Sequence, residues 1–259
     1  MNNSVELEVN NYIGTIFLNH QPLNVLTGDF LEEISRKVDE VQRDRQIRVL
    51  LVKSKSKKAF IAGADISSFP EINREIGQEL VDTGKKVFNK IEQLDVPVIA
   101  VIDGVALGGG LELALACDLR IASSSSKLGL PETGLGVFPG YGGTQRLPRY
   151  VGLGKAKEMI FTGSTLSAED AEKIGLVEHV AQSSEDLDTL SHSLALKISE
   201  KAPLAISKSK QVINSGYDLS LAEGQRLETK LFGDIAESDD LKEGVQAFNE
   251  KRSANFKGE

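Results

Sequence analysis

Three consecutive glycines, Gly108 to Gly110, stand between an apolar, β-prone run at 98–102 and a helical pattern at 111–116. A strand that ends in glycines and opens a helix leaves backbone N–H groups free beside the positive end of the helix dipole. Such a junction stabilises an anion, either a bound phosphate or an oxyanion that forms in a transition state. Glu112 lies in the first helical turn, where its carboxylate would repel a phosphate but could act as an acid or a base beside a carbonyl.

Two further features extend this interpretation. A second strand-to-glycine junction occurs at Gly63-Ala64-Asp65, and Glu132 lies in a glycine- and proline-rich loop at 129–143. Two junctions that each donate one backbone N–H to the same oxygen form an oxyanion hole, which suits a thioester enolate. Two carboxylates can then share acid and base work on a small molecule such as water. Each feature alone also occurs as a tight turn or a solvated glutamate, so it is their joint occurrence that favours catalysis.

The composition limits the classes of function. The chain has 259 residues, of which 40% are hydrophobic, and this is typical of a globular protein. Its formal net charge of -8 argues against a general binder of nucleic acid or of anionic membranes. The single cysteine, Cys117, lies in an apolar setting that predicts a buried, inert thiol and a reducing compartment. Neither a signal peptide nor an apolar run long enough to span a membrane is recognised, so we expect a cytoplasmic protein.

Hydrophobic periodicity predicts a mixed α/β core followed by helices. Alternation at 5–9 and 13–18 indicates a β-hairpin, and a helix is predicted from Asp29, with strands at 49–52, 98–102, 119–122 and 176–180. Helix-like spacing covers 71–94, a capped helix begins near Ser167, and Ser220 with Glu223 forms a capping box. We therefore divide the chain into a core at 1–183 that holds the active site and a helical C-terminal portion at 184–259.

The sequence resembles the crotonase (enoyl-CoA hydratase/isomerase) superfamily over essentially its full length. The matching blocks occur in the family's order: Leu18-Asn19, Asn24-Val25-Leu26, 59–66, 97–100, 104–112, Cys117-Asp118, 129–132, Pro139-Gly140, 142–147, Glu243-Gly244, Ala247-Phe248 and 250–252. The resemblance implies an α/β fold, the crotonase-type spiral of ββα units with a helical C-terminal trimerisation part. It also implies assembly as a homotrimer or as a dimer of trimers.

The resemblance also assigns roles to individual residues. The N–H groups of Ala64 and Gly109 match the family's oxyanion hole. Glu112 matches the glutamate that orients or deprotonates the water attacking C3 of a 2-enoyl-CoA thioester. Glu132 matches the glutamate that exchanges the proton at C2, which gives syn addition of water across the double bond. Residues matching the CoA and acyl path are Leu23, Asn24, Ala62, Asp65, Ile66, Gly140, Phe248 and Lys251, the last two approaching from the same or a neighbouring subunit.

The chain departs from the family pattern near the expected CoA phosphates. Ser67 stands where many hydratases have a lysine, and His20 replaces an arginine in a loop that is about one residue shorter. The basic loop at 53–58 contains three lysines that could supply a phosphate contact in place of the missing one: Lys55, Lys57 and Lys58.

Both glutamates together favour a 2-enoyl-CoA hydratase, because hydration needs a base for water and an acid for carbon. The alternative is a Δ3,Δ2-enoyl-CoA isomerase, which can work with one carboxylate, or another crotonase-family acyl-CoA lyase or dehydratase. The expected partner is an acyl-CoA thioester, with no metal, no nucleic acid and no cofactor apart from the CoA of the substrate. Acyl-chain length stays open, since it depends on walls expected at 69–94 and around Phe138 and Tyr141.

Other classes fit the sequence less well. A nucleotide-binding module would need a Gly-x-x-x-x-Gly-Lys-Ser/Thr loop, which the chain lacks, and Glu112 occupies the anion site. A Ser/His/Asp hydrolase would need a histidine near the glycine-rich blocks, whereas His20, His179 and His192 all lie outside them. A catalytically inactive binding homologue is disfavoured by the presence of both glutamates.

Overall fold

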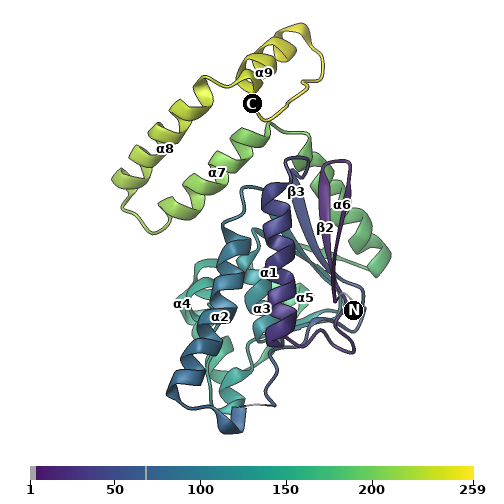
Figure 1. Ribbon diagram of the computed structural model, residues 1–259, viewed down its shortest axis with the longest axis vertical. Helices are drawn as coiled ribbons and strands as arrows, with labels where there is room; N and C mark the ends of the chain where they lie inside the picture. The colour runs from purple at the N-terminus through teal and green to yellow at the C-terminus, as the bar shows by residue number, and fades with distance from the viewer. Residues whose placement is uncertain (1–3, 68) are drawn as a thin grey trace.

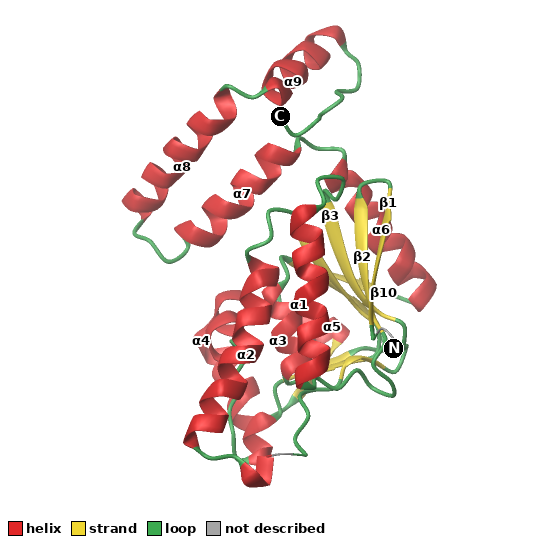
Figure 2. Ribbon diagram, in the orientation of Figure 1, coloured by secondary structure: helices red, strands yellow, loops and turns green. Residues whose placement is uncertain are grey.

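Two β-sheets organise the chain in the computed structural model, which describes residues 4–67 and 69–259. The larger sheet has the strand order β1-β2-β3-β5-β7-β10, and the smaller one β4-β6-β8-β9 (Figure 2). The larger sheet consists of β1 (Val5–Asn10), β2 (Ile13–Leu18), β3 (Val49–Ser54), β5 (Val98–Ile102), β7 (Leu119–Ser123) and β10 (His179–Ala181). The smaller sheet consists of β4 (Ala59–Ile61), β6 (Val105–Leu107), β8 (Lys127–Gly129) and β9 (Thr165–Ser167).

The chain repeats one supersecondary unit. A strand of the larger sheet leads into a strand of the smaller sheet and then into a helix, first in β3-β4-α2, next in β5-β6-α3 and then in β7-β8-α4. The helices of these units are α2 (Arg74–Glu92), α3 (Gly109–Ala116) and α4 (Gly143–Thr162), and short 3-10 turns precede two of them, η1 (Phe69–Glu71) and η2 (Glu132–Leu135). This is the spiral of ββα units expected from the sequence.

Alternating side chains of the larger sheet are buried in two separate cores. On β3, Leu50 and Val52 join the cluster that contains the helices α1 (Gly28–Arg43) and α2, whereas Val49 and Leu51 join the cluster beneath α6 (Ser184–Ser199). Figure 1 shows α1 and α2 on one face of this sheet and α6 beyond its other face. Burial on both faces explains why the central strands are continuously apolar.

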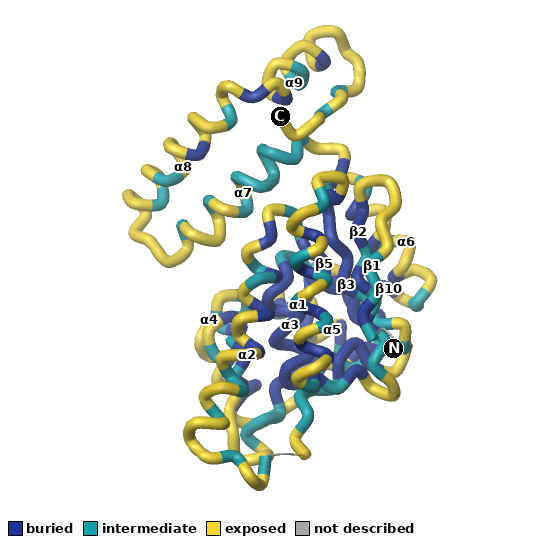
Figure 3. The backbone as a smooth tube through the Cα atoms, viewed as in Figure 1, coloured by how far each residue is buried: buried dark blue, intermediate teal, exposed yellow. Residues whose placement is uncertain are grey.

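The last three helices form a lobe that projects away from both sheets (Figure 1). They are α7 (Pro203–Gly216), α8 (Leu221–Ala236) and α9 (Asp239–Glu250). The predicted capping box at Ser220 and Glu223 begins α8. Much of this lobe is exposed (Figure 3), and Leu231 is the one buried residue of α8. Because α6 packs against the larger sheet, the projecting lobe begins after it, some residues beyond the predicted division at 183.

Some short elements were missing from the sequence prediction. The strands β6, β8 and β9 have three residues each, too few to show an alternating pattern. Helix α4 is longer but contains Pro148 and a non-helical Gly152, which hide its periodicity. The strand expected at 176–180 lies at β10. The helix expected at 71–94 is η1 followed by α2. The remaining helix, α5 (Ala168–Lys173), starts at the predicted cap Ser167. Within the described residues, no helix is long and apolar enough to cross a membrane.

The start of α3 lies unusually close to β4. A Cβ atom added to Gly110 would lie 2.2 Å from the backbone oxygen of Ile61, a separation that real Cβ atoms do not adopt. Glycine at this position therefore allows the helix that carries Glu112 to pack directly on the strand that leads to Ala64.

Replacing Gly110 with alanine should lower the free energy of unfolding by about 1–3 kcal/mol, because a backbone atom cannot move aside as a flexible side chain can. Denaturant titration of the variant and the parent measures this difference. Gly28→Ala is the matched control, since its Cβ would meet no described atom within 4 Å. Equal stability of the two variants would contradict the close approach.

Candidate active site

A cavity of about 280 Å³ lies at one edge of the smaller sheet. The strands β4, β6 and β8 are parallel neighbours, so the segments that follow them meet at this edge. Carboxyl ends of parallel strands are where α/β proteins commonly place ligands. Seven of the residues predicted from the sequence line the cavity: Ala62, Ala64, Ile66, Gly109, Glu112, Glu132 and Gly140.

The glycine junction after β6 exposes a backbone donor. Gly108 has a φ of 53°, a conformation that glycine adopts without steric cost, and it turns the chain from the strand into α3. Gly109 is the first residue of the helix, so its N–H has no acceptor within the helix. Among the described residues it donates to no other group, and Gly109 lines the cavity.

Ala64 presents a second donor for a different structural reason. It forms an isolated parallel bridge with Leu26, in which Leu26 N–H donates to the oxygen of Gly63 at 2.9 Å and Asp65 N–H to the oxygen of Leu26 at 3.0 Å. Successive peptide groups point in opposite directions along an extended chain. The N–H of Ala64 therefore points away from Leu26, and within the described part of the chain it has no acceptor.

The two junctions lie against each other. A Cβ atom on Gly63 would be 3.7 Å from the oxygen of Leu107, and one on Gly108 would be 3.8 Å from the Cα of Gly63. The donors of Ala64 and Gly109 thus border the same cavity at adjoining backbone segments. Both donors predicted from the sequence therefore border one cavity, and their joint binding of a single oxygen atom stays a prediction.

Glu112 is buried, with only 2% of its surface exposed, and one of its oxygens is firmly held. Its Oε1 accepts hydrogen bonds from the backbone N–H groups of Tyr141 at 2.8 Å and Gly143 at 2.7 Å. Gly143 permits this approach, since a Cβ atom there would lie 3.0 Å from the same Oε1. The loop before α4 therefore anchors the carboxylate and fixes its direction into the cavity.

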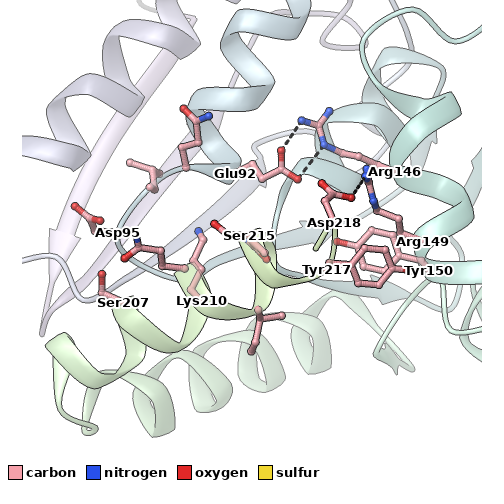
Figure 4. Close-up of a pocket in the computed structure, with 15 residues that line it drawn as sticks. Glu92, Asp95, Arg146, Arg149, Tyr150, Ser207, Lys210, Ser215, Tyr217 and Asp218 are labelled. Atoms are coloured by element: carbon pink, nitrogen blue, oxygen red, sulfur yellow. Dashed lines mark hydrogen bonds and ion pairs between the residues drawn. The ribbon is translucent and has the colours of Figure 1, made fainter. Parts of the chain in front are cut away.

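Arg146 fixes the loop that anchors Glu112. This arginine, 6% exposed, donates to the oxygen of Tyr141 at 3.1 Å and pairs with Glu92 of α2 at 2.7 Å. Figure 4 shows the ion pair at the edge of a separate groove of about 580 Å³, which lies between the core and α7 and includes neither active-site glutamate. The sequence analysis did not single out Arg146; the Gly-Tyr-Gly-Gly turn before it was the available signal, since a glycine-rich turn marks a backbone that another group must approach.

Glu132 lies beside the first glycine of the triplet and has a different environment. A Cβ atom on Gly108 would be 3.1 Å from the Oε1 of Glu132, a tight contact that places this carboxyl group directly against the glycine. Both carboxyl oxygens are buried, and neither has a hydrogen-bond partner among the described residues. Buried polar groups without partners are rare and are characteristic of functional sites.

Burial controls the electrostatics of both glutamates. Desolvation raises the pKa of Glu112 to about 7, with a further increase from the nearby Glu132 and a partial decrease from the Gly143 and Tyr141 N–H groups. Burial also raises the pKa of Glu132 above its usual value. The raised pKa of Glu112 places its proton exchange near neutral pH, which suits general acid–base catalysis.

Three predicted contacts lie next to the cavity but do not line it. Leu23 accepts a hydrogen bond from the N–H of Ala62 at 3.1 Å, and Asp65 accepts one from the N–H of Ser67 at 2.9 Å. The Asn24 side chain is a correction: it is 1% exposed and donates to Ser54 and to the oxygen of Phe60. Its burial leaves no surface for CoA, and it joins the loop to the strands instead.

The two C-terminal contacts lie in the projecting lobe. Phe248 is on α9 and Lys251 directly follows it, and Figure 1 shows α9 far from the smaller sheet that borders the cavity. Phe248 is 83% exposed. Within one chain these residues do not line the cavity, and their contact with CoA stays a prediction.

The lysines proposed for the CoA phosphates differ in their surroundings. Lys55 pairs with Glu6, and Lys57 lies 3.6 Å from Glu185. Lys58 has no carboxylate partner within the described residues.

The remaining candidate groups lie outside the cavity. Cys117 is fully buried, and burial raises its pKa to about 12, which agrees with an inert thiol. The histidines at 20, 179 and 192 do not line the cavity. Among residues 4–67 and 69–259, no three His, Cys, Asp or Glu residues are grouped so that they could hold a metal ion.

Comparisons with known proteins identify the family of this chain. The model of the family described as enoyl-CoA hydratase/isomerase matches residues 8–259. The chain belongs to the enoyl-CoA hydratase/isomerase family. It is 41% identical to a short-chain-enoyl-CoA hydratase of Clostridium acetobutylicum over 96% of both chains. It is also 39% identical to the human mitochondrial methylglutaconyl-CoA hydratase, over 91% of this chain and 70% of the human one.

Solved structures confirm the fold of this family member. The crystal structure of an enoyl-CoA hydratase from Bacillus anthracis superposes with a TM-score of 0.95 at 39% identity, covering 99% of this chain and all of the other. The crotonase-type α/β fold predicted from the sequence is therefore confirmed.

Replacing Glu112 with glutamine should change how stability depends on pH. The native carboxyl group has a pKa of about 7 against an ordinary value of 4.5, so the native state holds the proton more tightly than the unfolded state does. The parent protein therefore loses stability as pH rises from about 4.5 to about 7, by on the order of 3 kcal/mol, and the loss is complete above that range. Glutamine does not titrate, yet its side-chain oxygen can still accept from Tyr141 and Gly143.

Denaturant titrations of both proteins between pH 5 and pH 8.5 measure this effect. The stability of Glu112→Gln relative to the parent should increase across this interval and level off above about pH 7.5. A difference that does not change with pH would show that the Glu112 carboxyl group has an ordinary pKa in the native protein.

Proposed function

We propose that this protein is an enoyl-CoA hydratase that reversibly adds water across the 2,3 double bond of a 2-enoyl-CoA thioester to give a 3-hydroxyacyl-CoA. The observation that carries the proposal is the pairing, in one cavity, of two glutamates that have buried carboxyl oxygens with two backbone N–H donors that have no acceptor among the described residues. The relatives named as hydratases support it.

The cavity suggests a division of work between the residues. The thioester oxygen binds between the N–H groups of Ala64 and Gly109, which stabilise the negative charge that develops as an enolate forms. Glu112, with one oxygen held by the loop, orients a water molecule and accepts its proton while the hydroxyl oxygen bonds to C3. Glu132 donates a proton to C2, and transfer of a proton between the two carboxyl groups restores the starting state.

The hydrogen bonds at Glu112 support this assignment of acid and base. The N–H groups of Tyr141 and Gly143 favour the charged form of Glu112, whereas Glu132 has no such donor in the described structure. The proposed hydration step needs the charge on Glu112 and the proton on Glu132, and these two N–H groups stabilise that charge. Because the two carboxyl groups interact, their titration belongs to the pair.

We further propose that the protein needs no cofactor besides the CoA of its substrate, acts in the cytoplasm, and assembles as a homotrimer or a dimer of trimers. The assembly is supported by the projecting lobe, where large apolar side chains are exposed: Ile213, Tyr217, Leu221, Phe232, Val245 and Phe248. A neighbouring subunit that covers this surface would also bring Phe248 and Lys251 to another chain's CoA path.

Replacing either active-site glutamate with glutamine should lower kcat for the hydration of crotonyl-CoA by about 10²–10⁴-fold, because each substitution removes one proton-transfer group while keeping the volume. Loss of absorbance of the conjugated thioester follows the reaction, and circular dichroism checks that each variant is folded. A variant with near-normal turnover would contradict the role assigned to that glutamate.

The same assay separates the alternative function. A Δ3,Δ2-enoyl-CoA isomerase can work with one carboxylate, so it would interconvert 3-enoyl-CoA and 2-enoyl-CoA without forming the 3-hydroxyacyl product. Product analysis by chromatography distinguishes the two outcomes. Isomerisation with no hydration of short or long 2-enoyl-CoAs would reject the hydratase proposal.

Replacing Phe232 with glutamate should convert the oligomer to smaller species, because burying a charge in an apolar interface is unfavourable. Phe232 is 68% exposed in the single chain and is therefore available to a neighbour. Light scattering coupled to size-exclusion chromatography measures the change. Lys230→Glu is the control, since residues two positions apart lie on opposite sides of a helix. A parent protein that runs as a monomer would contradict the proposed assembly.

A further inference from the structure

The described residues that line the active-site cavity carry no positive charge. Apart from Glu112 and Glu132, the described lining residues are glycines, proline, alanines and larger apolar or aromatic side chains, and they include no lysine, arginine or histidine. Among these described lining residues, Tyr141 is the one with a side-chain hydroxyl. The charged groups that border the cavity are therefore both acidic.

The apolar wall comes from two segments on either side of the reacting groups. One segment runs from η1 through the short loop after it into α2 and contributes Phe69, Ile72, Leu80 and Val81. The other, η2 and the loop after it, contributes Leu135, Val137 and Phe138. Val81 also contacts the glycine loop, since a Cβ atom on Gly140 would lie 2.9 Å from its Cγ2. Beyond the carbonyl and the double bond, an acyl chain would meet only these surfaces.

We propose that this cavity selects uncharged acyl chains and rejects thioesters whose acyl group ends in a second carboxylate. The inference rests on the proposed function, because the binding of the thioester oxygen at Ala64 and Gly109 is what directs the acyl chain into the cavity. Family membership does not decide the question, because the relatives include proteins named for a short-chain enoyl-CoA and for methylglutaconyl-CoA.

The physical reason is the cost of burying an unpaired charge. A carboxylate that leaves water needs a cation or several hydrogen-bond donors, and here it would also be repelled by the two glutamates. In a five-carbon diacid the second carboxyl carbon is only two bonds from C3. It would therefore lie close to the two glutamates and beside the apolar wall. A methyl group at the same place would be stabilised by apolar contact.

Binding of two saturated thioesters tests the inference without requiring catalysis. Pentanoyl-CoA and glutaryl-CoA have the same number of acyl carbons and differ by a methyl group against a carboxylate. Isothermal titration calorimetry at pH 8 should give at least about tenfold weaker binding for glutaryl-CoA. Equal or tighter binding of glutaryl-CoA would overturn the inference, whatever the enzyme does to crotonyl-CoA.

A charge introduced at Leu80 should reverse the preference. Leu80 is half-buried on α2 and lines the cavity, so Leu80→Arg places a cation beside the acyl chain. We expect the ratio of glutaryl-CoA to pentanoyl-CoA affinity to rise about tenfold or more relative to the parent. Using this ratio cancels any general attraction of the new charge for the CoA phosphates.

Two matched variants complete the design. Ile76→Arg adds the same charge one turn earlier on α2, at an exposed residue that does not line the cavity, and Leu80→Met changes shape without charge. Both should retain the parental ratio. An increase with Ile76→Arg as large as that with Leu80→Arg would contradict the role of the cavity wall.

The parallel hydration assay separates the two proposals. If 2-pentenoyl-CoA is not hydrated but the parent still discriminates against glutaryl-CoA, the proposed reaction fails and the selectivity stands. If hydration proceeds and discrimination is absent, only the selectivity fails. Should Leu80→Arg not fold, as judged by circular dichroism, the parental ratio alone decides the inference.

Discussion

Burial of the Glu112 carboxylate is the constraint on which the rest of the site depends. A buried charge is tolerated only when other groups replace the water it has lost. Here the replacement is the pair of N–H groups from Tyr141 and Gly143, and these are available because Gly142, with a φ of 114°, turns the loop back towards α3. Arg146 then ties that loop to α2. One carboxylate thus links three helices.

The smaller sheet explains why residues so far apart in sequence meet. Its three parallel strands β4, β6 and β8 are adjacent, and each is followed by a segment of different chemistry. The first supplies Ala64, the second supplies Gly109 with Glu112, and the third supplies Glu132. The repeated ββα unit therefore delivers two donors and two carboxyl groups to one edge. Three-residue strands suffice for this purpose because the helices behind them provide the packing.

The fold and the site differed in how much of each the sequence could predict. Long apolar strands such as β5 and amphipathic helices such as α1 have clear periodicity, and family motifs marked the segments that line the cavity. The anchoring of Glu112 by Tyr141 and Gly143 was not predicted, because the glycine-rich turn at 140–143 marks a close backbone approach but does not identify the distant group that makes it. Asn24 illustrates the opposite error: its place in a motif suggested a ligand contact, whereas burial makes it a link between loop and strands.

The contrast between the two glutamates has a physical meaning beyond their shared burial. Glu112 keeps two hydrogen bonds in the native protein, so its position does not depend on what enters the cavity. Glu132 has none in the described structure, so its carboxyl group gains its hydrogen bonds only when water or a ligand arrives. A fixed group suits the orientation of a small, mobile reactant such as water. In the proposed reaction, a carboxyl group without partners in the protein is free to bond to the reacting molecule, and this suits proton transfer to C2 of the thioester.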